Sequence, residues 1–162
     1  MSAADQDWSF ALDEALALAK ESATEGEVPV GAVIVFEGKI IGRGRNRREQ
    51  NQDPLSHAEL HAIAEAAQAL GSWRLMGCTL VVTLEPCPMC LGALQQARVE
   101  QVIFGALDPK GGALSLGYTL HSDPRTNHRF SVEHHEDLRC GEVLREFFRS
   151  RRLRPDQNGK DS

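Results

Sequence analysis

Two short motifs contain side chains that bind metals and carry protons. His57 and Glu59 stand two residues apart, and Cys87 and Cys90 stand three apart behind Pro86. A catalytic zinc site uses three nitrogen or sulfur ligands and keeps a fourth position open for water, while a nearby acid handles the proton. The motifs therefore predict one Zn²⁺ per chain, held by His57, Cys87 and Cys90. Glu59 is then available as the catalytic proton carrier.

Two other interpretations of the first motif are open at this stage. Ser56 and Glu59 match a capping box, in which a serine begins a helix and a glutamate reaches back to its backbone. On this motif alone the capping box is favoured. A structural zinc site would need four ligands, and His61 lies one turn after His57 as a candidate fourth. The open three-ligand site is favoured over the structural site because it also explains Glu59.

The elements around the motifs predict how these residues are positioned. Residues 57–70 are alanine-rich and helical, and residues 87–98 form a second helix with Pro88 tolerated in its first turn. Both motifs then lie at helix N-termini, where the positive end of the helix dipole favours thiolates. The strands expected at 78–84 and 99–105 flank the second helix in a crossover, so they should be parallel.

The remaining segments predict the other elements of the fold. Apolar residues recur at helical spacing over 8–19, and residues 138–153 form a final helix. The apolar runs 33–36 and 40–42 form a hairpin, and 105–127 is a long loop rich in glycine, proline and aspartate. The expected fold is α/β, a three-layer α/β/α sandwich with a mixed central sheet.

Length and composition predict a soluble globular protein. The chain has 162 residues, of which 41% are hydrophobic and 25% charged. We expect one domain over residues 1–154 and a disordered tail over 155–162. No apolar run approaches the roughly 20 residues of a membrane span, and residues 1–7 lack the apolar core of a signal peptide. A cytoplasmic protein without a membrane partner is therefore expected.

Charge alone gives an ambiguous indication about nucleic acid. The net charge of −5 does not indicate general affinity for polyanions. Arginines nevertheless cluster in two places. One group lies towards the C-terminus, at Arg145, Arg149, Arg151, Arg152 and Arg154, and a second lies at Arg43, Arg45, Arg47 and Arg48. Such a cluster is either a local phosphate-binding patch or a solvated helix face.

The paired motifs resemble the signature of the zinc-dependent nucleobase deaminases. Further segments resemble the bacterial tRNA adenosine deaminases that act on the wobble base, from the first helix to Arg152. These segments are 27–33, 46–47, 53–54, 83–87, 104–106, 108–112, 127–128 and 147–149. Two segments depart from the family pattern. Leu55-Ser56 stands where a small pair such as Thr-Ala is usual, and 113–117 replaces an expected Gly-Ser-Leu sequence.

The resemblance implies hydrolytic deamination of adenosine to inosine in a tRNA anticodon stem-loop. It implies that Asn46 bonds the base and that 28–32, including Val30, walls the pocket. Asp108 and Asn127 would contact the flanking nucleotides. Asn46 and Asp108 also have plainer interpretations as turn residues.

The resemblance and the composition of the last helix together predict an RNA contact. Arg149, Arg151 and Arg152 are expected to bind phosphates, with Phe148 as a stacking partner. The alternative is that the aromatic residues only pack the helix on the sheet, and Phe147 is expected to be core. Similar enzymes also imply a homodimer.

Two alternative functions belong to other substrate or protein classes. A free-base or nucleoside deaminase, for guanine or cytosine, would share the zinc signature. The C-terminal arginines favour RNA over a small base, which carries no phosphate. A non-catalytic, zinc-stabilised RNA-binding module is a third possibility, and Glu59 argues against it because a structural site needs no proton carrier.

Overall fold

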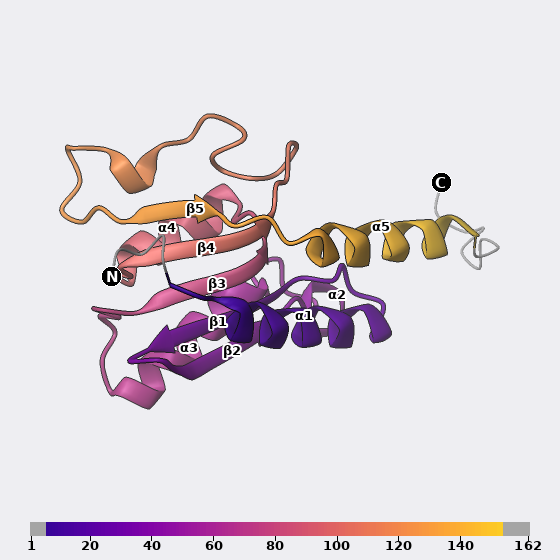
Figure 1. Cartoon of the computed structure of the whole chain (residues 1–162), viewed down its shortest axis with the longest axis horizontal. Helices are drawn as coiled ribbons and strands as arrows, with labels where there is room; N and C mark the ends of the chain where they lie inside the picture. Colours follow the sequence, from indigo (N-terminus) through magenta and orange to yellow (C-terminus); the bar gives the residue numbers. More distant parts are fainter. Residues whose placement is uncertain (1–5, 154–162) are drawn as a thin grey trace.

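A five-stranded mixed sheet forms the centre of the computed structural model, which describes residues 6–153. The strands are β1 (Gly31–Phe36), β2 (Lys39–Arg45), β3 (Thr79–Leu84), β4 (Gln101–Ala106) and β5 (Ser131–His134). They are arranged in the order β2-β1-β3-β4-β5 (Figure 1). β1 pairs antiparallel with β2 and β3, whereas β3, β4 and β5 are parallel. The predicted hairpin and the predicted parallel crossover are both confirmed.

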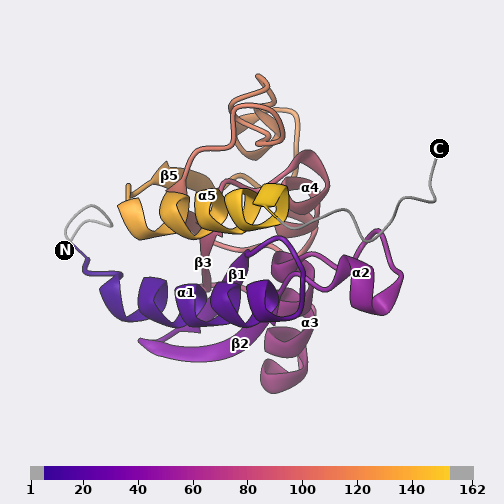
Figure 2. The ribbon, with the colours of Figure 1, turned by 90° about the vertical axis from the view of Figure 1, so that its right-hand side faces the viewer.

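Helices cover both faces of this sheet. They are α1 (Ser9–Thr24), the short α2 (Arg48–Asn51), α3 (Ala58–Leu70), α4 (Pro88–Gln96) and α5 (Leu138–Leu153), with a 3₁₀ turn η2 (Leu120–Ser122). α1 and α5 lie on one face, and α3 and α4 lie on the other (Figure 2). The predicted three-layer α/β/α sandwich is confirmed. The predicted tail, 155–162, lies outside the described residues. Within 6–153, no helix combines the length and apolarity that a membrane crossing requires.

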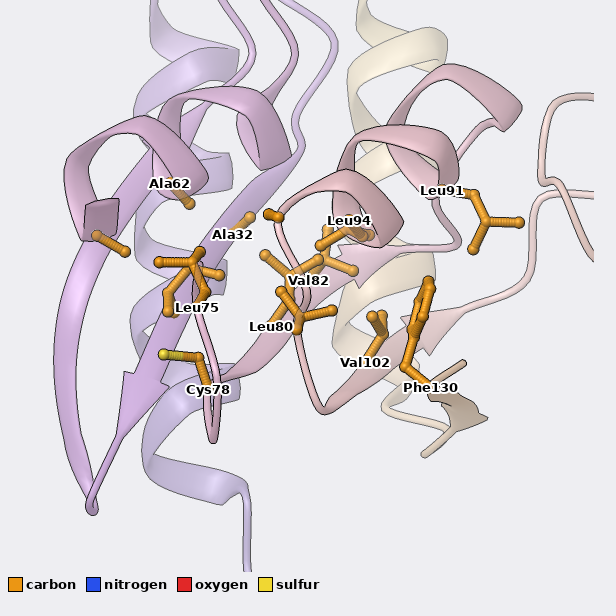
Figure 3. Packing of buried hydrophobic residues seen from close by; sticks show 14 of the residues in the cluster. Ala32, Ala62, Leu75, Cys78, Leu80, Val82, Leu91, Leu94, Val102 and Phe130 are labelled. Carbon is orange, nitrogen blue, oxygen red and sulfur yellow. The ribbon is translucent and has the colours of Figure 1, made fainter. Parts of the chain in front are cut away.

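Two separate apolar cores follow from the alternation of side chains along the strands. Leu80 and Val102 point to the face covered by α3 and α4, where they pack with residues such as Leu94 (Figure 3). Ile34 belongs to the same cluster. Their sequence neighbours point to the face covered by α1 and α5. These neighbours are Val33, Val35, Val81 and Ile103. Both faces of β1, β3 and β4 are therefore buried, which explains why these strands read as continuous apolar runs.

Glycines in β2 allow α3 to approach the sheet closely. A side chain added at Gly44 would overlap the carbonyl oxygen of Ala58 and would lie 2.7 Å from the backbone nitrogen of Ala62. Gly42 faces the next turn of the same helix in the same way. The first turn of α3 follows His57, so this close approach also fixes where the predicted metal ligand lies.

We expect Gly44→Ala to lower the free energy of unfolding by about 1–3 kcal/mol, because the added methyl group would push α3 off the sheet. Urea unfolding monitored by circular dichroism measures the change. Gly92→Ala is the matched control. Gly92 lies within α4, and a methyl group added there would project into open space. The control should be neutral or stabilising by up to about 1 kcal/mol. Equal stabilities for Gly44→Ala and the wild type would contradict the packing argument.

Candidate functional site

The predicted metal ligands lie where two helices begin on the same face of the sheet. His57 is the N-cap residue of α3, and Cys87 is the N-cap residue of α4, but neither side chain caps its helix. Instead, His57 Nδ1 lies 3.6 Å from the sulfur of Cys87 and 3.5 Å from the sulfur of Cys90. The three ligand atoms all lie within 4.8 Å of one another.

The spacing of these atoms fits a zinc ion. Tetrahedral zinc with bonds of about 2.3 Å to sulfur and about 2.0–2.1 Å to nitrogen separates the nitrogen from each sulfur by about 3.5–3.6 Å. Both nitrogen–sulfur distances have this value. Among the described residues, the group contains no fourth histidine, cysteine or carboxylate. The donor set therefore matches an open three-ligand centre better than a closed structural one.

Hydrogen bonds within the group favour the ionised form of one thiol. The Cys90 thiol donates to Cys87, and together with His57 this lowers the pKa of Cys87 to about 4. The same hydrogen bond, aided by burial, raises the pKa of Cys90. The pKa of His57 is raised, chiefly by its hydrogen bond to Cys87, while burial and the nearby charge of Arg48 act in the opposite direction. Thiolate is the form that binds metal.

His61 and Ser56 bond to each other rather than to the metal group. His61 Nε2 lies 2.6 Å from the Ser56 hydroxyl, which also accepts a hydrogen bond from Asn51 at 3.0 Å. Burial lowers the pKa of His61. The capping-box interpretation is wrong, because His57 rather than Ser56 is the N-cap and no side-chain cap bond forms. The Ser56 hydroxyl instead ties the segment before α3 to the second turn of the helix.

Glu59 is the buried acid of the site. Only 4% of its surface is exposed, although it lines the same cavity as His57 and Cys87. Burial is the main cause that raises the pKa of its carboxyl group. A carboxyl group with a raised pKa can take up and return a proton closer to neutral pH than an ordinary glutamate can.

The cavity that contains Glu59 brings together residues from several elements. Its volume is about 190 Å³. The lining residues are Val28, Val30, Asn46, Arg48, His57, Ala58, Glu59, Leu84, Glu85, Cys87 and Asp108. Three of the predicted substrate contacts, Val30, Asn46 and Asp108, are therefore adjacent to the metal group. The Asn46 side chain also bonds the backbone, donating to Val28 O at 3.1 Å and accepting from Arg48 N at 3.3 Å.

Glu85 was not singled out by the sequence, yet it organises one wall of the cavity. Its carboxylate is buried and accepts hydrogen bonds from Asp108 N at 3.2 Å, Ser115 N at 2.8 Å and Ser115 Oγ at 2.6 Å. The loop that follows β4 is therefore fastened to the residue two positions before Cys87. A charged residue between an apolar strand and Pro86 is the signal that could have identified it, because a buried charge needs partners.

Asn127 does not reach the metal cavity within one chain. It lies in a separate hollow of about 220 Å³, beside Gln95 and Arg98 at the C-terminal end of α4. The metal group lies at the opposite end of that helix.

α5 extends past the end of the sheet at which β3 ends and the metal cavity lies (Figure 1). Arg149 and Arg152 are exposed on it, and Phe148 is 45% exposed. Phe147 is 8% exposed, so its predicted place in the core is confirmed. Arg151 is used structurally, because it donates to Gly26 O at 2.7 Å and lies over the Phe147 ring. The exposed cations of α5 are thus available at the same end of the molecule as the cavity.

The fold and the site together define the class of the zinc-type nucleobase deaminases, in which a His/Cys/Cys group stands beside a glutamate that is not a ligand. Residues 6–152 match the MafB19-like deaminase family. The tRNA-specific adenosine deaminase of Bacillus subtilis (strain 168) is 49% identical over 142 residues, which span 87% of this chain and 88% of that protein. The chain therefore belongs to the MafB19-like deaminases, and among them to the family of tRNA-specific adenosine deaminases.

Two solved structures are similar to this one. A tRNA:A34 deaminase, described for A-to-I editing at the wobble position of transfer RNA, superposes with a TM-score of 0.79 and 39% identity. That match covers 84% of this chain and 99% of the other. A guanine deaminase from Bacillus subtilis gives a TM-score of 0.61 and 32% identity, covering 97% of this chain and 99% of the other. The fold is thus shared by enzymes with different substrates.

Proposed function

We propose that this chain hydrolytically deaminates adenosine to inosine at the wobble position of a tRNA anticodon. The observation that carries the chemistry is the cavity in which buried Glu59 faces the open His57, Cys87 and Cys90 group. The choice of tRNA adenosine is supported by the 49% identity to a tRNA-specific adenosine deaminase over most of both chains.

The residues of the cavity divide the reaction between them. Zinc bound by His57, Cys87 and Cys90 would lower the pKa of a water molecule, which becomes a nucleophile at neutral pH. Glu59 takes the proton from this water and delivers it to the ring nitrogen beside the carbon under attack. Glu59 then takes the proton of the added hydroxyl group and passes it to the departing amine, which leaves as ammonia while the hydroxyl oxygen becomes the carbonyl of inosine.

The cavity walls orient the base and exclude bulk water. Val28 and Val30 supply apolar contacts, and Asn46 lies beside them where its amide can bond the base edge. The bonds that Asn46 already makes to the backbone hold its amide in one orientation. Asp108, on the loop fastened by Glu85, would contact a flanking nucleotide.

The proposed partner is the tRNA anticodon stem-loop, whose unpaired bases can be turned out of the stack into a pocket. Arg149 and Arg152 would bind its phosphates, and Phe148 offers an exposed ring for stacking. Asn127 would contact the RNA only beyond the cavity, since it lies at the other end of α4.

We also propose a homodimer in the cytoplasm, where tRNA is used. The loop after β4 exposes large apolar side chains at Leu107, Leu116 and Tyr118, which a second copy could cover. Light scattering of the purified protein determines the number of chains.

Guanine deamination is the second candidate, because a guanine deaminase shares the fold over 97% of this chain. The two candidates differ in what lies outside the cavity. A free base needs no phosphate contact, so the exposed cations of α5 would have no role in its binding.

We expect inosine to form in an anticodon stem-loop RNA, with no comparable turnover of free guanine or cytosine. Binding of the stem-loop should weaken steeply as salt rises, because each neutralised phosphate of a single strand contributes a log–log slope of about −0.7. Replacing Arg149 and Arg152 together with alanine removes two such contacts and should flatten this slope by about 1.4, without loss of zinc. Salt titrations of binding by fluorescence anisotropy measure both slopes.

Arg151 is retained in this experiment because it fastens α5 to the loop after α1. Arg43→Ala serves as the control, since Arg43 is paired with Glu14 on α1. Equal slopes for the double variant and the wild type would remove α5 from the RNA interface. Efficient turnover of guanine with none on the stem-loop would favour the second candidate.

A further inference from the structure

Arg48 is the one permanent cation among the described residues that line the metal cavity. It is exposed, so it stands where the cavity opens to solvent rather than at its floor. Its charge is close enough to act on His57. Arg48 is the first residue of α2, two positions after Asn46, and it had not been distinguished from its arginine neighbours in the sequence.

The other arginines of this segment have acidic partners. Arg43 lies 2.8 Å from Glu14, Arg45 lies 2.7 Å from Glu25, and Arg47 lies 3.9 Å from Glu25. Within residues 6–153, Arg48 forms no ion pair at 4.0 Å or less and its guanidinium makes no hydrogen bond. Its guanidinium is thus left unpaired beside the site.

None of the described acids in the cavity wall pairs with Arg48, and two of them, Glu85 and Asp108, use their oxygens for hydrogen bonds to the neighbouring loop. Glu85 accepts from the backbone of Asp108 and from Ser115. Asp108 accepts from the backbone nitrogens of Lys110 at 3.3 Å and Gly111 at 3.1 Å. An anion that enters the mouth of the cavity therefore meets a free guanidinium.

The backbone that carries Arg48 is held firmly. Its own nitrogen donates to Asn46 Oδ1, and the buried carboxylate of Glu27 accepts from Glu49 N at 3.0 Å and Gln50 N at 3.3 Å. Binding an anion would then order only the Arg48 side chain, which limits the entropic cost.

The size of the cavity determines which part of a substrate meets Arg48. At about 190 Å³, it is smaller than the roughly 300–1,000 Å³ of pockets that hold drug-sized molecules, and it suits a single base. When the base is turned into the cavity, the ribose and its phosphates remain at the mouth. A guanidinium binds phosphate with two parallel hydrogen bonds, which makes arginine well suited to that contact.

We propose that Arg48 binds a phosphate adjacent to the adenosine whose base occupies the cavity, and so selects a nucleotide within a strand over a free base. The inference rests on the proposed function and assigns a specificity-determining contact to that site. The phosphate is the one on either the 5′ or the 3′ side of the reacting nucleotide, and the experiment distinguishes them.

The test combines a protein change with a neutralised phosphate in the RNA. Three stem-loops are compared: an unmodified one, and two that carry an uncharged methylphosphonate linkage on the 5′ or the 3′ side of the target adenosine. For the wild type, one of the two modified RNAs should lose about tenfold in kcat/KM, as expected for a charge-assisted hydrogen bond. Arg48→Ala should lose about tenfold on the unmodified RNA and almost nothing further on that modified RNA.

Two variants and one assay keep the result interpretable. Arg43→Ala, an arginine with an acidic partner on α1, should behave like the wild type on all three RNAs. Arg48→Lys should recover part of the loss, because it keeps the charge but not the paired hydrogen bonds. Zinc content should be unchanged in every variant.

The outcomes separate this inference from the function on which it rests. If the wild type forms no inosine in the unmodified stem-loop, the proposed function is wrong and the inference falls with it. If the wild type forms inosine but the losses from Arg48→Ala and from each methylphosphonate multiply, only the inference is wrong. Unchanged turnover in Arg48→Ala would overturn it as well.

Discussion

Cys87→Ala is expected to purify with almost no zinc and to have no measurable deaminase activity. The change leaves His57 and Cys90 as the two remaining protein ligands, and it removes the thiol whose pKa is lowered to about 4. A catalytic zinc ion needs three protein ligands to remain bound while a water occupies the fourth position. Metal analysis by mass spectrometry after dialysis, together with an inosine assay, measures both effects.

Matched controls separate loss of a ligand from general damage. Cys78→Ala removes another thiol, but one buried in the apolar core on the α3 and α4 face. His61→Ala removes an imidazole that bonds Ser56 instead of the metal group. Both variants should keep one zinc per chain. A folded His61→Ala protein without zinc, or a Cys87→Ala protein with its full metal content, would contradict the three-ligand assignment.

The helices and the central strands could be predicted because their patterns are local. The final helix, 138–153, has the observed bounds of α5. The parallel pairing of β3 and β4 followed from the helix that connects them. For the final helix, the apolar periodicity of one segment was sufficient to predict the structure. For β3 and β4, the order of strand, helix and strand along the chain was sufficient.

β5 and α2 could not be predicted, because partners distant in sequence hold them. β5 has the polar sequence Ser-Val-Glu-His, and its strand geometry comes from pairing with β4. α2 is four residues long, and buried Glu27 fixes its first turn from another part of the chain. Neither segment has an internal pattern strong enough to indicate its conformation.

The residues of the site also fall into two groups: those that local sequence spacing predicts, and those that only tertiary packing brings to the cavity. The ligands and Glu59 follow from residue types at fixed spacing. The structure brings the three ligands into one group, and Glu59 lines the same cavity as His57 and Cys87. Arg48 and Glu85 line that cavity because of tertiary packing, so no local spacing identified them. Asn127 was assigned by resemblance, and the structure places it in a different hollow.

We expect Glu59→Ala to lower turnover by about 10²–10⁴, the usual cost of losing a general acid–base catalyst. Zinc content and stem-loop affinity should remain close to those of the wild type, because the carboxylate moves protons and does not belong to the ligand group. Single-turnover inosine formation measures the chemical step, and anisotropy measures binding. Glu59→Gln is the matched variant, since it keeps the shape of the side chain but cannot accept the proton.

The stability of the same two variants tests the role of Glu59 independently. Burial raises the pKa of this carboxyl group, which means that the fold gains little from its charged form. A helix cap, by contrast, contributes about 0.5–2 kcal/mol to stability when it is present. If Glu59 is a catalytic carboxylate whose burial lowers the stability of the fold, both variants should lose turnover. Their free energy of unfolding should be unchanged or higher than that of the wild type. If Glu59→Gln instead kept near-normal turnover and unfolded more easily, the residue would be structural, and the proton carrier would have to be sought elsewhere in the cavity.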